Sequence, residues 1–542
     1  MSQDPSNESA EVPAATSRQR RDMAWWIVMA VAVVGMVTMW WMIRDRTGEV
    51  SYTVDDCYIH ATLAKILAAH GSFGIVPGEF AAASSSLNWT LLLAVVFFFA
   101  GPAAWVPGLL ATIFGFLTLE RADRWMRETG ANRWMRLVVG LMILAYAPLL
   151  PIASTGMEHT FHAWSLTGLL LCLLRTSRNP GASLVPLFFW ALVAGGARYE
   201  SLFFLPILLP WLAAGGRWKT AVTLAAGMVL PAAIFAVYSM AHGGYPLPNS
   251  LMLKGNIDKA FEIRAFRVAL ENQHIFVLLV LLAVSMAAKW FRPGPDGRAT
   301  LWISIAVTVT LLIHLQLAQL GWFYRDEGYL IVLALVEASS LGAALAALGK
   351  GRHFLVPMTA CIVLAFATLP LFWRSSRATS EIVHAAGNIR DQQLQMARVT
   401  RLLGPGARVA VNDLGAVSFF SEARVLDLYG LGDNALARAK RNRTYGADRL
   451  QSRLEETATD FVICYPSWFT PPDNLPETLI PVESWDLADN LICGSERVVF
   501  YATDRASEIR LRRALDTYRK SFLPVPESTN QMTPLSDPTV TP

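Results

Sequence analysis

Charged residues are scarce in this 542-residue sequence. They make up 16% of it, whereas hydrophobic residues make up 54%. Soluble globular proteins carry about 25% charged residues. The formal net charge of +4 gives no indication of a nucleic-acid partner. Long apolar stretches recur along the chain, and roughly 17–25 apolar residues are enough to cross a bilayer. The composition therefore predicts a polytopic α-helical membrane protein.

Several cofactor motifs are also missing. The sequence has no GxxxxGK[ST] loop for nucleotide phosphates, no HExxH, and no Cys/His spacing typical of zinc sites. We therefore expect no required cofactor, although a divalent cation is compatible with the acidic residues described below. Five cysteines are present. Cys464 and Cys493 fall in a region expected outside the cytoplasm, where they either form a disulfide or remain free.

The N-terminal 22 residues are polar and predict a disordered, cytoplasmic segment. The apolar run Met23–Ile43 follows, with a pair of tryptophans at each end, which is typical of a membrane-spanning helix. It is too long for the apolar core of a cleaved signal peptide. We interpret it as the first spanning helix, with its N-terminus inside.

Basic loops set the orientation of the remaining helices. The segment "ERADRWMRETGANRWMR" holds five arginines and should lie on the cytoplasmic side. This requires that Leu87–Ala100 does not cross the membrane, so we interpret it as a membrane-seated part of the first outer loop, residues 44–103. The other basic loops then fall inside as well: Arg175–Arg178, Gly215–Lys219, Lys289–Arg298 and Gly349–His353.

This alternation of inner and outer loops predicts about eleven spanning helices within residues 23–374, the last at about Phe354–Trp373. Residues 375–523 then lie outside the cytoplasm. They predict an α/β domain, with an amphipathic helix at 381–403 and strands at 407–411, 460–464 and 497–502. Residues 524–542 predict a disordered tail.

The predicted outer loops share ionisable and amide side chains: Asp55, Asp56, Glu158, His159, Arg198, Glu200, Asn249, Lys254, Arg325, Asp326 and Glu327. Such residues at helix ends near a bilayer are costly unless they are paired or solvated, so they are candidates for a site. Because five loops bring them to one face, we expect a polar cavity there.

Simpler interpretations stay open for the same residues. Arg198–Glu200 and Arg325–Glu327 could be interfacial ion pairs. Glu158 could belong to a solvated helix start, and Lys254 could extend along the interface to reach water. The alternative for Asp55 and Asp56 is an N-cap of a helix over Cys57–Ala69. A cap needs only one acid, and a second adjacent carboxylate raises the pKa of its neighbour, which suits a general base.

An ordered set of motifs carries a family resemblance. "DDCYIHATLAKILAAHGSFGIVPGE", "SSSLNWTLLLA", "STGMEHTFHAW", "ARYESLFFLPILL", "GGYPLPNSLMLKGN", "WFYRDEGYL" and "VAVNDLGAVSFFSEARVLDLYGLGD" follow one another between Thr53 and Asp433. Together they resemble GT-C superfamily glycosyltransferases, in particular the mycobacterial terminal arabinofuranosyltransferase family. The resemblance implies transfer of a sugar, such as a pentose, from a polyprenyl-phosphate donor to a cell-envelope glycan, lipid or protein at a bacterial plasma membrane.

The resemblance also implies roles for the outer-loop residues. Asp55 and Asp56 would be catalytic, with Asp55 as the base that deprotonates the acceptor hydroxyl. The donor phosphate and sugar would be bound by His60, Glu158, Arg198, Glu200, Asn249, Lys254, Arg325 and Glu327. Relatives carry an arginine shortly after the acidic pair, where this chain has His60 and Lys65. They have "SP" where this chain has Ser86 and Leu87. These departures leave the sugar open.

Asn412 and Asp413 follow a predicted strand, where α/β folds often place ligand contacts, so they are candidates for acceptor binding. A turn with a helix cap is the alternative. Two other functions compete with glycosyl transfer: a lipid or sugar transporter, and a non-catalytic subunit of envelope assembly. Transporters usually place charges near the bilayer midplane. Here most charges lie at one rim, which favours the enzyme.

Overall fold

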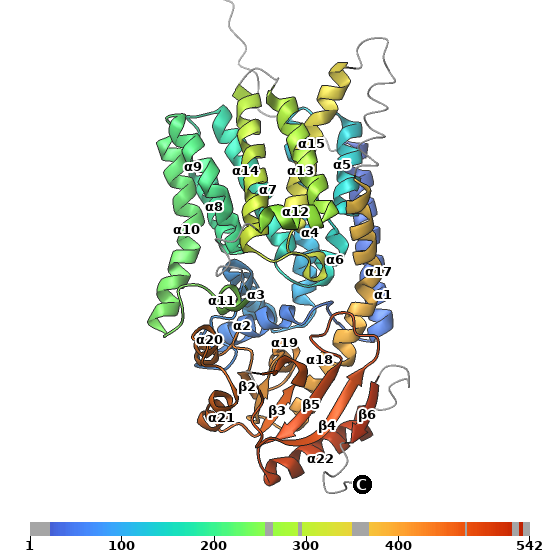
Figure 1. The fold of residues 1–542 in the computed structure, drawn as a ribbon. Coiled ribbons are helices and arrows are strands. Elements are labelled where there is room, and N and C mark those ends of the chain that lie inside the picture. Colours follow the sequence, from blue (N-terminus) through green and yellow to red (C-terminus); the bar gives the residue numbers. More distant parts are fainter. Residues whose placement is uncertain are drawn as a thin grey trace, which may run out of the picture.

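The computed structural model describes residues 22–254, 264–290, 295–348, 368–471, 474–522 and 530–534. Helices form a bundle at one end of the molecule, and a β-sheet with its own helices lies at the other (Figure 1). A layer of short helices separates the two.

The bundle is built from long, apolar helices. Its elements are α1 (Met23–Thr47), α4 (Val106–Glu128), α5 (Arg133–Tyr146), α7 (His159–Arg178), α8 (Val185–Ala197), α9 (Leu205–Ala214), α10 (Trp218–Ala241), α13 (Gln273–Trp290), α14 (Pro295–Leu317), α15 (Gly328–Leu348) and α17 (Leu369–Asp391). Within the described ranges, four helices are long and apolar enough to cross a membrane. The total of about eleven stays a prediction. Most of the last predicted span, Phe354–Trp373, lies outside the described residues.

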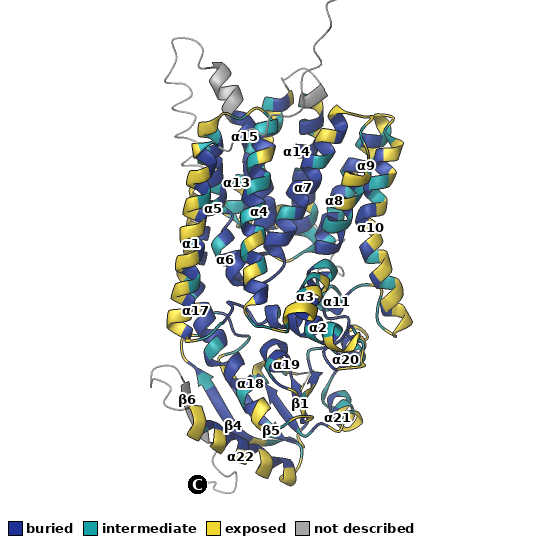
Figure 2. Cartoon of the chain, turned by 180° about the vertical axis from the view of Figure 1, so that it is seen from behind, coloured by how far each residue is buried: buried dark blue, intermediate teal, exposed yellow. Residues whose placement is uncertain are grey.

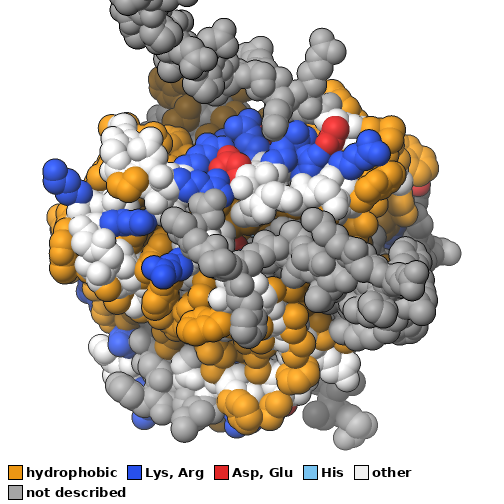
Figure 3. Space-filling model, turned by 90° about the horizontal axis from the view of Figure 1, so that it is seen from above, with side chains coloured by type: hydrophobic (Ala, Val, Ile, Leu, Met, Phe, Trp, Pro, Cys, Tyr) orange, Lys and Arg blue, Asp and Glu red, His pale blue; other side chains and the backbone are white. Residues whose placement is uncertain are grey.

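Apolar side chains cover the outward sides of the bundle. Val34 and Val37 on α1 are exposed, as are Val222 and Val237 on α10, and both helices carry long exposed stripes in Figure 2. Exposed apolar surface on this scale is stable in lipid but not in water. Lysine and arginine side chains gather at the end of the bundle that lies away from the sheet (Figure 3).

Short elements form the intermediate layer. These are α2 (Asp56–His70), α3 (Leu87–Ala100), α6 (Leu149–Ser154), η1 (Tyr199–Phe204), α11 (Asn249–Lys254), α12 (Ala265–Glu271) and η3 (Trp322–Tyr324). Gly71 ends α2 in the left-handed conformation, and its N–H bonds the carbonyl of Leu67. The bounds of α3 match the segment expected to be membrane-seated, and its exposed Phe98 and Phe99 form an apolar tip.

The C-terminal region contains a six-stranded mixed sheet. Its strands are β1 (Arg408–Val411), β2 (Arg424–Asp427), β3 (Phe461–Cys464), β4 (Ile480–Leu487), β5 (Arg497–Ala502) and β6 (Asn530–Pro534), in the order β2-β1-β3-β5-β4-β6. β1 pairs in parallel with β2 and β3, and the other pairs are antiparallel. The helical elements are α18 (Gln393–Leu402), α19 (Gly415–Phe420), α20 (Asn434–Arg441), α21 (Ala447–Glu456), η4 (Pro466–Trp468) and α22 (Arg505–Phe522).

Two features of this region differ from the sequence-based expectation. The helix expected over 381–403 is broken at Gln392, so α17 ends at Asp391 and a separate α18 follows. α17 also runs without a break through the boundary expected at 374/375. β6 lies within the segment predicted as a disordered tail. Its backbone pairs with β4, an interaction that polar side chains do not signal in sequence.

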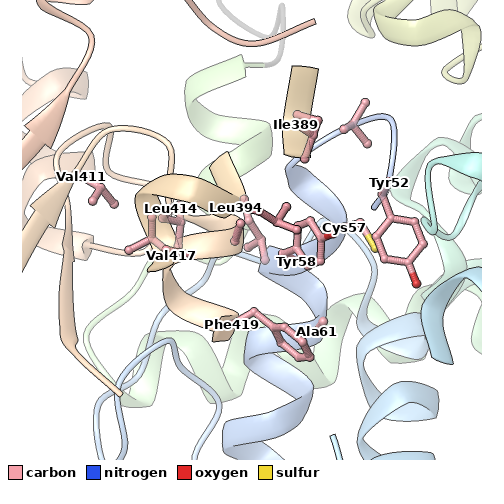
Figure 4. Close-up of a cluster of buried hydrophobic side chains, with 14 of the residues drawn as sticks. Tyr52, Cys57, Tyr58, Ala61, Ile389, Leu394, Val411, Leu414, Val417 and Phe419 are labelled. Atoms are coloured by element: carbon pink, nitrogen blue, oxygen red, sulfur yellow. The ribbon is translucent and has the colours of Figure 1, made fainter. Parts of the chain in front are cut away.

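The first outer loop and the C-terminal region share one hydrophobic core. Tyr58 on α2 packs edge-on against Phe420 of α19, with 5.3 Å between the ring centroids. The same cluster includes Ile389 from α17 and Leu394 from α18 (Figure 4). Packing of this kind fixes where β1 and α19 lie relative to the two acids at the start of α2.

Candidate active site

A cavity of about 690 Å³ lies between the bundle and the sheet. Segments from the whole length of the chain meet in it: the start of α2, η1, α11, the end of α14, the η3 loop and the loop after β1. Twelve residues have catalytic or binding roles predicted from the sequence, and nine of them line this cavity: Asp55, Asp56, His60, Arg198, Glu200, Lys254, Arg325, Asn412 and Asp413. The other three, Glu158, Asn249 and Glu327, are buried next to residues that line it.

Asp56 is the partner of two cations. Arg325 Nη2 donates to its Oδ2 at 2.5 Å, and Lys254 Nζ lies 3.6 Å from its Oδ1. Burial would raise the pKa of Asp56, but Lys254 and Arg325 outweigh burial and hold that pKa well below its usual range. Asp56 is therefore an ionised, poorly basic carboxylate. The half-exposed Lys254 is held in an ion pair here and does not simply reach for solvent.

Asp55 contacts the C-terminal region directly. Its Oδ2 accepts from the backbone N–H of Gly415 at 2.7 Å, and its Oδ1 accepts from Ala416 N–H at 2.8 Å. It occupies the N-cap position of α2 but makes no side-chain cap hydrogen bond, so the N-cap interpretation does not hold for this side chain. Burial, followed by the neighbouring Asp413 carboxylate, raises the pKa of Asp55 well above its usual range.

Glu158, Arg198 and Glu200 form a buried network beside the acids. Arg198 Nη1 donates to Glu158 Oε1 and its Nη2 to Glu200 Oε1, both at 2.7 Å. His60 Nε2 lies 3.6 Å from Glu158 Oε2. The Arg198–Glu200 ion pair considered from the sequence is present. Glu158 is fully buried, so it does not belong to a solvated helix start.

The Arg325–Glu327 ion pair considered as an alternative from the sequence does not form. Arg325 faces Asp56 and Asp326, whereas Glu327 accepts from Arg374 of α17 and from the N–H of Gly321. Arg374, 47 residues further along the chain, is thus the ion-pair partner of Glu327 in place of the nearby Arg325. Within the part of the chain that the structure describes, Arg325 Nη1 is buried and has no hydrogen-bond partner. That donor is available to a ligand.

Asn249 holds α11 against the C-terminal region. Its Nδ2 donates to the carbonyl of Leu431 at 3.1 Å and to Asn434 Oδ1 at 2.9 Å. The neighbouring Ser250 lines the cavity, and its buried Oγ has no partner among the residues described. Asn249 therefore supports the site from behind, whereas Ser250 and Lys254 face the cavity.

Asn412 and Asp413 follow β1 and lie opposite the bundle. Asn412 Oδ1 accepts from the Tyr465 N–H at 3.2 Å, while its buried Nδ2 has no partner among the described residues. Asp413 Oδ2 accepts from Gln393 Nε2 at 2.6 Å and from the Tyr465 hydroxyl at 3.2 Å. Neither side chain caps a helix: Leu414 is the N-cap of α19, and α19 has no side-chain cap bond.

Sequence reasoning missed several residues of this wall. Ser250, Tyr429 and Trp468 line the cavity, and Gln393 and Tyr465 hold Asp413. Ser250 directly follows Asn249, which was selected, and Tyr429 lies within the motif that ends at Asp433. Trp468 and Gln393 carried no recognisable signal, because isolated aromatic and amide residues occur throughout such a domain.

Cys464 and Cys493 are both free. Cys464 lies in β3 within a cluster formed with α20 and α21, whereas Cys493 belongs to the larger core around Tyr465 and Trp485. Because the two thiols are buried in different clusters, the disulfide considered from the sequence does not form. Within the described ranges, no group of three or more His, Cys, Asp or Glu side chains could hold a metal ion. A cofactor requirement stays open.

Comparison with known proteins gives a fold assignment. Residues 387–503 match a family described as a domain of unknown function (DUF8728). The sequence matches no curated protein. ArnT from Cupriavidus metallidurans bound to undecaprenyl phosphate matches with a TM-score of 0.50 and 12% identity, over 90% of this chain and 99% of that chain. An Archaeoglobus fulgidus oligosaccharyltransferase in complex with Zn and sulfate matches with a TM-score of 0.51 and 12% identity, over 89% and 73% of the two chains.

The arabinosyl part of the resemblance gains little from these matches. Arabinofuranosyltransferase AftD from mycobacteria has a TM-score of 0.45 and 14% identity, with 90% of this chain and 42% of that chain covered. That likeness is too distant to carry an argument about the sugar. The predicted resemblance to GT-C glycosyltransferases is confirmed at the level of the fold. The chain is thus a multi-pass membrane protein with the fold of the GT-C glycosyltransferases.

Proposed function

We propose that this protein transfers a sugar from a polyprenyl-phosphate donor to a hydroxyl group of an extracytoplasmic acceptor. One observation carries the proposal: a single cavity holds two cations on one side and a buried carboxyl group with a raised pKa on the other. Glycosyl transfer needs both groups. The phosphate that leaves gains negative charge, and the attacking hydroxyl must lose its proton.

The cationic side suits the donor phosphate. Lys254 and Arg325 lie together at Asp56, and the unpartnered Arg325 Nη1 and Ser250 Oγ add two hydrogen-bond donors. Asp56 neutralises part of their charge and sets their position. ArnT is described in complex with undecaprenyl phosphate. Sharing its fold supports a polyprenyl-phosphate-linked donor here, with the lipid chain remaining in the membrane.

The carboxyl side suits the acceptor. In the proposed reaction, the Asp55 carboxylate accepts the proton of the acceptor hydroxyl while that oxygen attacks the anomeric carbon. The bond from this carbon to the phosphate oxygen breaks, and polyprenyl phosphate leaves as an anion against Lys254 and Arg325. Asn412 Nδ2 is placed to donate to the acceptor. We propose a cell-envelope glycan, lipid or protein as the acceptor, and a pentose as one candidate sugar.

Charge distribution supports an orientation of the protein in its membrane, which we propose to be a bacterial plasma membrane. The basic end of the bundle would face the cytoplasm, because cytoplasmic loops carry an excess of Lys and Arg (Figure 3). The cavity and the C-terminal region lie at the other end, outside the cytoplasm in this orientation. A transporter or an assembly subunit remains an alternative. A transporter would need access to its site from both sides of the membrane, whereas this cavity lies at one end of the bundle.

Replacement of Asp55 tests the proposal. The full-length protein in lipid nanodiscs is supplied with polyprenyl-phosphate pentoses and hexoses together with envelope glycans, and release of polyprenyl phosphate is measured. Asp55→Asn should lower turnover by about 10²- to 10⁴-fold, the usual contribution of a general base. Donor binding should persist. Asp45→Asn, at an exposed position of α1, is the matched control and should keep full activity.

Full activity of Asp55→Asn would mean that the base is another residue. If wild-type protein binds the donors but never releases polyprenyl phosphate, the transporter or assembly role gains support. Mass spectrometry of envelope glycans and lipid-linked sugars from a deletion strain identifies the sugar and the acceptor.

A further inference from the structure

Asp413 brings a second carboxyl group to Asp55 from the opposite end of the sequence. It follows β1 and lies two residues before Gly415, whose N–H bonds the Asp55 carboxyl group, so the two carboxyl groups lie close enough to interact. Both residues line the cavity. Asp56, the neighbour of Asp55 in sequence, instead faces Lys254 and Arg325. The structure therefore divides three acids into an ion-paired one and two that face each other.

The C-terminal region holds both members of this acid pair. Gln393 Nε2 and the Tyr465 hydroxyl donate to Asp413, while two consecutive backbone N–H groups, from Gly415 and Ala416, donate to Asp55. Asp413 and these two N–H groups lie within four residues of one another. The segment that positions the Asp55 carboxyl group thus also carries its partner.

The donors that contact the pair are neutral: an amide, a phenol and two peptide N–H groups. Asp55 is buried and Asp413 is partly buried. Two carboxylates held close together away from water cannot both be ionised without a large electrostatic cost, and such pairs hold one proton between them. We propose that Asp413 is a positioning residue of the catalytic centre and shares one proton with Asp55, so that the C-terminal region completes the acid–base unit.

This inference rests on the proposed glycosyl transfer and makes its base more specific. At rest Asp55 holds the shared proton against the Asp413 carboxylate. When the acceptor binds, this proton moves to Asp413, and the Asp55 carboxylate then accepts the proton of the attacking hydroxyl. Burial and the Asp413 carboxylate raise the pKa of Asp55, which makes it a stronger base than Asp56, whose pKa is lowered. The unpartnered Nδ2 of Asn412, which is 3% exposed, is a hydrogen-bond donor for a bound acceptor beside the pair.

The acid pair makes the stability of the protein depend on pH in a definite direction. Asp56 and Cys57 of α2, Lys254 of α11, Tyr465 and Cys493 also face the pair. Because the pKa of Asp55 is raised in the folded protein, its contribution to stability is present at low pH. That contribution is lost as the pH rises through the folded-state pKa. Removal of the Asp413 carboxylate should move this loss toward lower pH.

The first test uses the purified full-length protein without donor or acceptor. Thermal unfolding is measured between pH 4 and 8 for the wild type, Asp55→Asn, Asp413→Asn and the double variant. We expect Asp413→Asn to shift the Asp55 titration to lower pH and the double variant to resemble Asp55→Asn. An unchanged pH dependence in Asp413→Asn would overturn the proposal. Asp427→Asn is the control: it removes a buried acid of the same region whose pKa is raised to about 6.

A second measurement does not depend on the stability of the variants. Infrared spectra of the wild type near pH 7.5, where Asp427 with its pKa of about 6 is ionised, should contain the C=O stretch of a protonated carboxyl group. Both Asp55→Asn and Asp413→Asn should lose this band, and Asp427→Asn should keep it. A band that persists in Asp413→Asn would contradict a shared proton. Neither experiment uses substrate, so failure of the pair and failure of the proposed function are distinguishable.

Discussion

Gly415 leaves no room for a side chain at the point where the C-terminal region meets Asp55. A Cβ at this position would lie 2.3 Å from the Asp55 carbonyl oxygen and 2.4 Å from its Oδ2. The two N–H bonds to Asp55 need this close approach. The reason for a glycine here is therefore contact with the acid, since Gly415 lies within a helix.

We predict that Gly415→Ala displaces Asp55 or α19. Overpacking of a buried contact should lower the free energy of unfolding by about 1–3 kcal/mol. Misplacement of a reacting group by about 1 Å should lower turnover by roughly 10². Thermal unfolding and the transfer assay measure the two effects. Gly215→Ala is the control, because its nearest neighbour would lie at 3.5 Å, an ordinary contact. If Gly415→Ala has wild-type turnover, the contact is not needed for catalysis.

At the scale of elements, α11 has only six residues, but hydrogen bonds from Asn249 hold it against the C-terminal region. Asn249 bonds the Leu431 carbonyl and Asn434 with its side chain, and its backbone N–H bonds the Ala82 carbonyl. Five residues later, Lys254 reaches Asp56. These hydrogen bonds of Asn249, the Asn249 tether, therefore set where Lys254, one of the proposed phosphate-binding cations, lies.

Asn249→Ala should loosen α11. Loss of the two side-chain bonds leaves buried acceptors unpaired and should lower the free energy of unfolding by about 1–3 kcal/mol. It should also raise the KM for the donor more than it lowers kcat, because Asn249 does not reach the cavity. Titration of the donor in the transfer assay separates the two constants. Asn442→Ala, at an exposed position, should change neither. An Asn249→Ala protein with the wild-type KM would show that Lys254 is held without the Asn249 tether.

Local patterns predicted some elements well and others poorly. The ends of α3 and β5 agree with the sequence pattern, since a run of apolar residues between clear turn signals defines both. β2 and β4 were missed because β2 has only four residues, without apolar/polar alternation, and β4 contains charged residues, so both give little periodic signal. The break at Gln392 was missed for a similar reason, as no glycine or proline marks it.

For the candidate site, the sequence predicted which residues take part but not which residues pair with one another. The outer-loop acids and cations could be grouped from the positions of the basic loops alone. Their partners could not, because partner choice depends on tertiary packing: Asp55 bonds Gly415, 360 residues away, and Glu327 takes Arg374 in place of Arg325. Sequence identifies which side chains carry chemistry, and the fold decides which of them meet.

At the scale of the whole molecule, the bundle has two chemically distinct ends: lysine and arginine side chains gather at the one away from the sheet (Figure 3), and the cavity lies at the other, against the C-terminal region. We predict that a cysteine introduced by Glu422→Cys, at an exposed position between α19 and β2, reacts with a membrane-impermeant thiol reagent in intact cells. Ser183→Cys, in the loop between α7 and α8, should react only after permeabilisation. Mass spectrometry of the labelled protein measures both, with the wild type as background. The reverse pattern would invert the proposed orientation.

The core shared by α2 and α19 also has a consequence for biosynthesis. The first outer loop leaves the ribosome early, yet the segment that bonds Asp55 follows 360 residues later. Until then, Tyr58 and its apolar neighbours on α2 lack the surface that buries them. A chain that stops before β1 would hold the donor-side cations but no partner for Asp55. An interrupted translation product should therefore be catalytically silent, with an unprotected apolar loop that chaperones or proteases can recognise.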